Sequence, residues 1–233
     1  MSDLERNITV ILVRPENPEN IGLVARNMKN TGFQNLSLVY KGPLPPKAYV
    51  TAVHAHNILD EVQFFPGVKQ ATENQQMVFA ASSKPRKNFS FMSLKESVEK
   101  IFRFPRSTKI GLLFGNERTG LTSEELVHSN FKFTIPQVSP QPSYNLGSAV
   151  LLTLFRIFTF PSFSGEAQED KPLSREKQEE CIHQILNKLE QKRFIHETNK
   201  RHVTQMIYDL IGRMCITDKD RRLLLALFSK GIR

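Results

Sequence analysis

Short, continuous apolar runs recur along the first two thirds of the chain, separated by stretches whose apolar residues return at helical spacing. A short apolar run bounded by turn residues is typical of a strand buried on both faces. We predict such strands at residues 8–13, 36–39, 77–81, 110–114 and 131–135. Because strands that alternate with helices form βαβ units, the pattern predicts an α/β fold with a mostly parallel sheet.

The stretch between the first two strands shows how the helices are inferred. Its apolar residues keep the spacing of one helical face, at Ile21, Val24, Ala25 and Met28. Asn20 is expected to cap this helix, and Gly32 to end it in a left-handed conformation. Thr122 and Glu125 form a capping-box pattern for a later helix. Further helices are predicted at residues 47–56, 68–74, 93–102 and 145–160, whereas the rest of 43–66 shows no clear pattern.

The pattern changes after residue 160. Residues 161–173 hold Pro, Ser, Gly and acidic residues without periodicity, which is typical of a linker. Beyond them, amphipathic stretches predict helices at 174–193, 199–214 and 218–230. We therefore expect a first domain over residues 1–160, a linker over 161–173 and a small C-terminal helical extension over 174–233.

The composition supports a packed core and a polyanionic partner. Hydrophobic residues make up 39% of the 233 residues and include 17 Phe, enough for a large core. The net charge of +9 favours nucleic acid, because Lys and Arg gain affinity by releasing counterions from phosphates. A basic protein without such a partner is the alternative, since net charge reports on non-specific binding.

Several features argue against a metal site, a membrane span and secretion. The two cysteines, Cys181 and Cys215, form no Cys-x-x-Cys pair and are expected to be reduced thiols. The longest apolar stretch, residues 149–160, contains Arg156 and is too short to cross a bilayer. The charged start of the chain does not resemble a signal peptide. We therefore expect a cytoplasmic protein with no membrane partner and no metal.

Three polar motifs, at residues 20–26, 115–121 and 143–150, each lie where a predicted strand gives way to a helix. Open α/β sheets bind their ligands at such points. In the first motif, Arg26 lies about 140° around the helix axis from Ile21, at about 100° per residue, so it is expected to point away from the core. It is either a solvated helix arginine or part of a ligand site.

The second motif places Gly115 and Gly120 at the two ends of a tight turn, where glycine allows positive φ and close approach to a ligand. It lacks the Gly-Lys-Ser/Thr of a phosphate-binding loop and the dinucleotide fingerprint. Glu117 would repel a phosphate and favours a cationic or neutral ligand. A generic strand-to-helix turn is the alternative interpretation.

The third motif begins the longest predicted helix with Ser143, Tyr144 and Asn145, after a proline-rich loop. Backbone N–H groups at a helix start can bind the edge of a base or a carboxylate. Ordinary capping by Ser143 or Asn145 is the alternative.

Together with the Ala81-Ser82-Ser83 strand end, the three motifs in this order resemble the signature motifs of the SpoU/TrmH-type SPOUT RNA 2′-O-methyltransferases. The whole chain resembles the TrmJ-like branch of that family, more loosely in its C-terminal helices. The resemblance implies an α/β fold with a deep trefoil knot, S-adenosylmethionine bound in the knot, and a homodimer. Topology rules alone would not predict a knot.

The resemblance also implies roles for individual residues. Catalytic roles would fall to Arg26, Asn20, Ser143 and Asn145. Contacts to the methyl donor would come from Ala81, Ser82, Ser83, Phe114, Gly115, Asn116, Glu117, Gly120, Ile135, Pro142, Ser143, Tyr144 and Leu146. Tyr144 replaces the Leu that is usual in the family, and its ring is expected to stack or pack at the adenine pocket.

The implied reaction is methylation of a ribose 2′-hydroxyl in RNA, with an anticodon-loop cytidine or uridine of tRNA as first candidate and ribosomal RNA as second. Candidates for phosphate contacts are Lys84, Arg86, Lys87, Arg103 and Arg106, each of which is equally compatible with ordinary solvated charge. Two other classes stay open. One is an RNA-binding relative without catalysis, and the other is a nucleotide-dependent enzyme on an ordinary doubly wound sheet, which the missing phosphate loop disfavours.

Overall fold

The computed structural model of the 233-residue chain describes residues 6–83, 86, 88–138, 143–161 and 171–229. Its centre is a seven-stranded sheet in the order β3-β2-β1-β6-β4-β7-β5. The strands are β1 (Ile8–Val13), β2 (Asn35–Val39), β3 (Gln63–Phe65), β4 (Met77–Ala81), β5 (Phe91–Ser93), β6 (Ile110–Phe114) and β7 (Phe131–Thr134). All neighbouring strands in this sheet pair in parallel, which confirms the predicted α/β fold.

The central strands β1, β6 and β4 are almost completely buried, as their continuous apolar runs predict. Their registers align the ends of the strands, with Leu12 opposite Phe114 and Ala80 opposite Leu113. Because every strand runs in the same direction, the carboxyl ends of β6, β4 and β7 open along one edge of the sheet.

Strands β3 and β5 were not predicted from the sequence. Each has three residues and lies at an outer edge of the sheet. An edge strand is covered less than a central one, and Gln63 and Phe64 of β3 are indeed exposed. Such short strands therefore lack the apolar run on which the other predictions depended.

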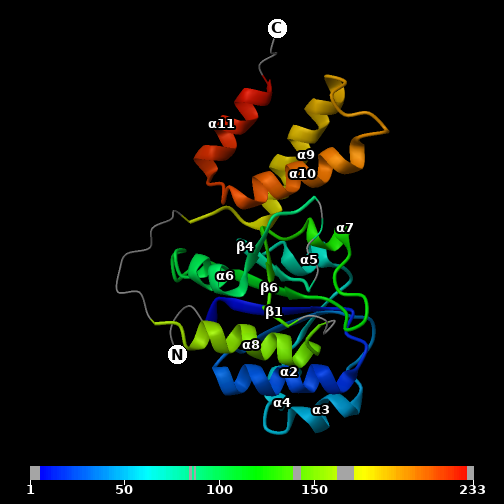
Figure 1. The fold of residues 1–233 in the computed structure, drawn as a ribbon, viewed down its shortest axis with the longest axis vertical. Coiled ribbons are helices and arrows are strands. Elements are labelled where there is room, and N and C mark those ends of the chain that lie inside the picture. The colour runs from blue at the N-terminus through cyan, green and yellow to red at the C-terminus, as the bar shows by residue number, and fades with distance from the viewer. Residues whose placement is uncertain (1–5, 84–85, 87, 139–142, 162–170, 230–233) are drawn as a thin grey trace.

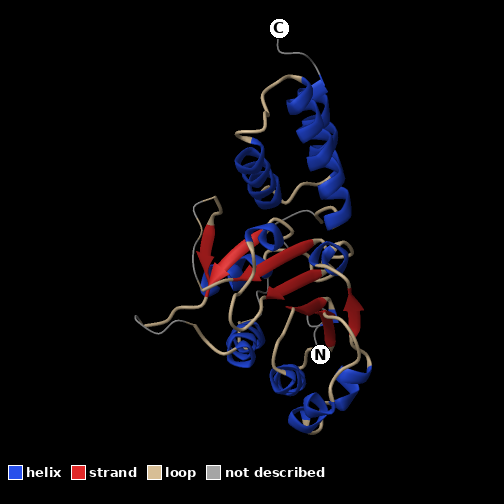
Figure 2. Cartoon of the chain, turned by 90° about the vertical axis from the view of Figure 1, so that its right-hand side faces the viewer, coloured by secondary structure: helices blue, strands red, loops and turns tan. Residues whose placement is uncertain are grey.

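Helices cover both faces of the sheet, as Figure 2 shows. The helices of the first two thirds are α2 (Pro18–Thr31), α3 (Pro46–Ala52), α4 (His56–Asp60), α5 (Val68–Thr72), α6 (Leu94–Ile101), α7 (Ser123–Leu126) and α8 (Leu146–Phe158). The larger core packs α2, α6 and α8 against one face, and α2 and α8 lie side by side (Figure 1). A smaller core packs α5 and α7 against the other face.

The start of α2 differs from the prediction. Asn17, not Asn20, is the N-cap, and its side chain accepts a hydrogen bond from the Glu19 N–H. Pro18 follows at the first helical position, where its missing N–H costs nothing. Asn20 is therefore a buried residue within the first turn. Gly32 ends the helix with φ +85°, as predicted.

The prediction of one helix over residues 47–56 is wrong. The helix α3 already ends at Ala52, before Val53, whose φ of +55° is incompatible with a right-handed helix. The next helix, α4, begins at His56 and lies almost entirely beyond the predicted range. The predicted capping box of Thr122 and Glu125 is confirmed at the start of α7. A second box, formed by Ser93 and Glu96, begins α6.

The C-terminal third forms the helices α9 (Arg175–Gln191), α10 (Lys200–Arg213) and α11 (Asp218–Ser229), close to the predicted ranges. They extend from one end of the α/β body (Figure 1) and share a core of their own. Most of the predicted linker, residues 162–170, lies outside the described residues. Within the part of the chain that the structure covers, no helix is both long and apolar enough to cross a membrane.

Candidate functional site

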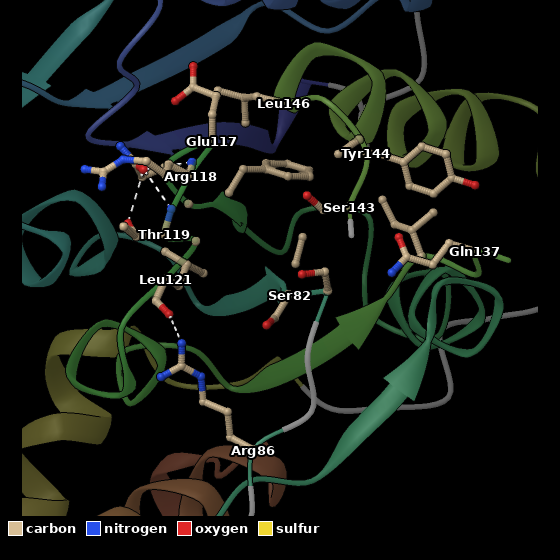
Figure 3. Close-up of a pocket in the computed structure, with 18 residues that line it drawn as sticks. Ser82, Arg86, Glu117, Arg118, Thr119, Leu121, Gln137, Ser143, Tyr144 and Leu146 are labelled. Atoms are coloured by element: carbon tan, nitrogen blue, oxygen red, sulfur yellow. Dashed lines mark hydrogen bonds between the residues drawn. The ribbon is translucent and has the colours of Figure 1, made fainter. Parts of the chain in front are cut away.

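A cavity of about 220 Å³ opens at the carboxyl ends of β4, β6 and β7 (Figure 3). Its walls come from residues 81–83 and 86 at and after the end of β4, from residues 114–121 at and after the end of β6, and from residues 135, 137, 143, 144, 146 and 149 after β7 and at the start of α8. These segments are far apart in the sequence. The strand order brings them together at the edge where open α/β sheets bind ligands.

The cavity gathers most of the residues that the family resemblance implied for the methyl donor. The lining includes Ala81, Ser82, Ser83, Phe114, Gly115, Asn116, Glu117, Gly120, Ile135, Ser143, Tyr144 and Leu146. Pro142 lies outside the described residues. The lining residues that the prediction omitted are Arg86, Arg118, Thr119, Leu121, Gln137 and Ala149. Four of these lie inside the second and third motifs, so their place could have been inferred from the motifs themselves.

The second motif folds into a tight loop that depends on both of its glycines. A Cβ on Gly115 would come within 2.4 Å of the backbone of Gly120 and Leu121, so no side chain fits there. Gly120 has φ +66°, a conformation that favours glycine. The Asn116 side chain closes the loop, because its Oδ1 accepts from the N–H groups of Arg118 and Thr119, each at 3.0 Å.

Glu117 connects this loop to the start of α2. Its Oε1 accepts a hydrogen bond from Asn20 Nδ2 at 2.8 Å, and its Oε2 accepts one from the Glu16 N–H at 2.9 Å. Partial burial acts to raise the pKa of Glu117, but the bonds from Asn20 and from the N–H groups of Glu16 and Asn17 outweigh it and hold that pKa below its ordinary value. Its carboxylate points away from Ser82 and Ser143 (Figure 3).

Asn20 also connects α2 to the third motif. Its Oδ1 accepts a hydrogen bond from Asn145 Nδ2 at 3.0 Å. Asn145, one of the two capping residues considered in the alternative interpretation, is the N-cap of α8, and its Oδ1 accepts from the Gly147 N–H at 2.9 Å. The chain Glu117–Asn20–Asn145 therefore joins all three motifs by side-chain hydrogen bonds.

Arg26 is exposed on α2, as the helical spacing predicts. It is not among the described residues that line the cavity of its own chain. Of the predicted catalytic set, Ser143 lines the cavity, Asn20 and Asn145 are hydrogen-bonded to each other beside it without lining it, and Arg26 lies on the outer surface.

Tyr144 has a different contact from the one expected for an adenine-stacking ring. Its hydroxyl donates a hydrogen bond to the Pro136 carbonyl at 2.9 Å. The ring points away from Ser82 and Ser143 (Figure 3), and the residue is 41% exposed. Its contact thus anchors the start of α8 to the segment that follows β7.

The predicted phosphate contacts are distributed over the molecule. The Arg86 guanidinium donates to the Leu121 carbonyl and to Ser123 Oγ, so it binds within the protein. Arg103 and Arg106 precede β6 and therefore lie at the amino edge of the parallel sheet, opposite the cavity. The Arg106 guanidinium lies over the Phe102 ring, 5.3 Å from its centre. Lys84 and Lys87 lie outside the described residues.

Metal ligands are not clustered in the part of the chain that the structure describes, since no group of three or more His, Cys, Asp or Glu side chains there could hold an ion. The cavity combines apolar walls with serine hydroxyls and tight backbone turns. Fold and site together define an α/β protein with a small-molecule pocket at the carboxyl edge of a parallel sheet.

The chain belongs to the SpoU rRNA Methylase family, which matches residues 7–155. It is 30% identical over 228 residues to the tRNA (cytidine-2′-O-)-methyltransferase TrmJ of Methanocaldococcus jannaschii, covering 95% of this chain and 98% of that protein. It is 31% identical to the uncharacterized tRNA/rRNA methyltransferase LasT of Escherichia coli K12, over 65% of this chain and 68% of LasT.

A solved structure extends the similarity to the C-terminal helices. The crystal structure of TrmJ from Z. mobilis ZM4 matches with a TM-score of 0.81 and 27% identity, over 95% of this chain and 97% of that chain. The SPOUT-type α/β fold with a C-terminal helical extension is thereby confirmed. The implied trefoil knot depends on the chain path between β7 and α8, where residues 139–142 lie outside the described residues.

Proposed function

We propose that the protein is an S-adenosylmethionine-dependent RNA ribose 2′-O-methyltransferase. The observation that carries this proposal is that the second and third family motifs line one cavity, while Asn20 of the first motif is hydrogen-bonded to both of them through Glu117 and Asn145. Unrelated turns and helix caps would not need to meet in this way.

The cavity fits the chemistry of this methyl donor. The apolar side chains of Phe114, Ile135 and Leu146 suit the adenine ring of the donor. The hydroxyl groups of Ser82 and Ser143 suit the polar groups of the donor. The Glu117 carboxylate adds negative charge to the loop that forms one wall of this cavity, which suits a cationic rather than an anionic ligand, and its hydrogen bonds hold its pKa below the ordinary value. When bound, the cofactor supplies a methyl group already activated for transfer.

The protein must then align the ribose hydroxyl in line with that methyl group and help the hydroxyl lose its proton. Alignment alone is worth roughly 7–11 kcal/mol in the best intramolecular reactions. Arg26 is assigned to the hydroxyl. Its guanidinium group holds the adjacent phosphate and stabilises the developing oxyanion. Ser143 and Asn145 hold the wall of the cavity at the start of α8.

We infer that Arg26 acts at a cavity supplied by a second subunit. It is exposed on α2 outside its own chain's pocket, and α2 lies beside α8 (Figure 1). The outer side of α8 carries apolar residues that solvent reaches, namely Leu151, Leu152, Phe155 and Phe158. We therefore infer a homodimer in which these helices meet and Arg26 acts at the cavity of the partner subunit.

The proposed substrate is tRNA, with an anticodon-loop cytidine or uridine as the methylated nucleotide. Support comes from TrmJ of Methanocaldococcus jannaschii, which shares nearly the full length of this chain, and from the net charge of +9. Ribosomal RNA is the second candidate, because the family is named for it. We place the reaction in the cytoplasm, and the proposed chemistry uses no metal.

The test is incubation of the protein with isotopically labelled S-adenosylmethionine and either total tRNA or ribosomal RNA, followed by nucleoside mass spectrometry. The expected product is a 2′-O-methylated cytidine or uridine in tRNA only. Label in ribosomal RNA alone would show that ribosomal RNA, and not tRNA, is the substrate. RNA binding with no donor binding in calorimetry would instead identify a relative that has lost catalysis.

A further inference from the structure

The C-terminal helices contact the α/β body through a buried polar cluster centred on Asp209 of α10. Its side chain is 7% exposed and accepts hydrogen bonds from Lys132 Nζ at 3.2 Å and from Arg213 Nε at 2.9 Å. It also accepts from Ser90, through the backbone N–H at 3.4 Å and the hydroxyl at 3.3 Å. Two of these partners, Lys132 and Ser90, belong to the α/β body.

The first partner lies on a strand that continues into the cavity wall. Lys132 is in the middle of β7, and its side chain is completely buried. The next residue, Phe133, accepts a hydrogen bond on its carbonyl from the Ser82 N–H at 3.0 Å. After β7 the chain reaches Ile135 and Gln137, both of which line the cavity.

The second partner lies in the loop between β4 and β5, residues 82–90. At one end of this loop, Ser82 and Ser83 line the cavity. At the other end, α10 holds the loop twice, because Asn88 Nδ2 donates to Gln205 Oε1 at 2.8 Å in addition to the Ser90 contacts with Asp209.

Arg86, in the middle of the same loop, contacts the cavity wall that the second motif forms. Its guanidinium donates to the Leu121 carbonyl (dashed in Figure 3) and to Ser123 Oγ at 2.9 Å. Hydrogen bonds thus hold Asn88 and Ser90 of this loop to α10, and hold Arg86 of the same loop to the end of the second motif. The Phe89 N–H also donates to the Arg86 carbonyl at 3.1 Å. Both loops supply part of the pocket.

We propose that α10 is a positioning element of the methyl-donor pocket, with Asp209 and Gln205 as positioning residues for the walls built by β7 and the 82–90 loop. The inference rests on the proposed function and extends it to residues that touch neither donor nor RNA. A buried charge pair keeps its partners in place because breaking it would leave an uncompensated charge. Loosening this anchor lets the walls move and weakens donor binding.

The experiment measures S-adenosylmethionine binding by calorimetry and steady-state kinetics for the full-length Asp209→Asn and Gln205→Ala variants. We expect the donor Kd and KM to rise about ten-fold for Asp209→Asn, which corresponds to about 1.4 kcal/mol, and about three-fold for Gln205→Ala. The kcat at saturating donor and the KM for RNA stay within two-fold of the unaltered protein. A general loss of structure would instead lower kcat and RNA binding as well.

The control is Asp218→Asn on α11, because Asp218 forms comparable ion pairs with Arg221 and Arg222 at the surface. It is expected to leave donor binding unchanged. If Asp209→Asn does not fold, Gln205→Ala decides, since it removes the Asn88 contact without leaving a buried charge. Unchanged donor affinity in Gln205→Ala and in any folded Asp209 variant overturns the inference. If the unaltered protein itself binds no donor, the proposed function fails. This outcome differs from failure of the inference alone, in which the unaltered protein and the variants bind the donor equally well.

Discussion

Asn20 shows what a single residue contributes and how far the sequence predicts it. Its position in the first motif is readable from the sequence, and its amide was expected to cap α2. Instead it donates to Glu117 and accepts from Asn145, residues 97 and 125 positions away. Hydrogen bonds over such separations depend on the packing of whole elements, so local pattern cannot predict them. The capping role of Asn17 could have been predicted from the sequence, because its hydrogen bond is local.

Asn20→Asp is predicted to disrupt the junction of the three motifs. The new carboxylate loses the donor to Glu117 and places a second negative charge 2.8 Å from it. We expect a loss of stability of about 1–3 kcal/mol together with weakened donor binding. Urea unfolding and calorimetry measure the two effects. Asn30→Asp, at an exposed position of the same helix, is the control, and equal behaviour of the two variants would contradict the prediction.

Arg26→Lys is predicted to separate catalysis from binding. Lysine keeps the charge but not the planar pair of N–H donors that holds a phosphate and an oxyanion together. RNA affinity is expected to stay within about three-fold, while kcat falls by about 100-fold, a size typical for one lost charge-stabilising donor. Single-turnover methylation and a filter-binding assay give the two numbers. Arg103→Lys, exposed at the opposite edge of the sheet, is the control, and full turnover by Arg26→Lys would remove Arg26 from the reaction.

At the scale of elements, the predictions succeeded where burial is greatest. The apolar runs of β1, β4 and β6 identified the centre of the sheet, because a strand covered on both faces must be apolar throughout. Strands β3 and β5 escaped, since a three-residue edge strand has no such run. The break between α3 and α4 was also missed, because Val53 is a residue type that rarely adopts positive φ.

Gly115→Ala tests whether the second motif is built on close backbone approach. Its Cβ would lie 2.4 Å from backbone atoms of Gly120 and Leu121, so the loop must open. We expect donor binding to fall by at least about ten-fold, as the displaced loop forms one wall of the pocket. Gly67→Ala is the matched control, because Gly67 has an extended backbone and its Cβ would approach only the flexible end of the Gln70 side chain. Calorimetry with S-adenosylmethionine would contradict the prediction if both variants bound alike.

For the whole molecule, the proposed dimer makes a prediction about mixed subunits. If Arg26 serves the cavity of the partner subunit, then Arg26→Ala and Gly115→Ala chains are each inactive alone but form one intact site when combined. Refolding an equal mixture is expected to restore about a quarter of the activity, because half of the dimers are mixed and each has one working site. An inactive mixture whose mixed dimers are verified by mass spectrometry would place each site within one chain.

The buried cluster under α10 predicts a dependence of stability on pH. Burial lowers the pKa of Lys132 to about 8, against the attraction of Asp209 and with Arg175 and Arg213 adding to the shift. Between that pH and the ordinary lysine range the unfolded chain binds more protons, so this group makes the protein more stable as the pH rises above 8. Urea unfolding from pH 7 to 10 measures the effect. It should be absent in Lys132→Met and present in Lys95→Met, an exposed control.

The anchor between β7 and α10 has a consequence for how the protein matures on the ribosome. Lys132 is synthesised 77 residues before Asp209. Until α10 leaves the exit tunnel, Asp209 cannot pair with the ammonium group of Lys132 on β7. Burying that ammonium group unpaired would cost free energy, so we expect it to stay in water. Although every family motif is complete by residue 150, we expect the nascent chain to acquire affinity for its methyl donor only with the last helices.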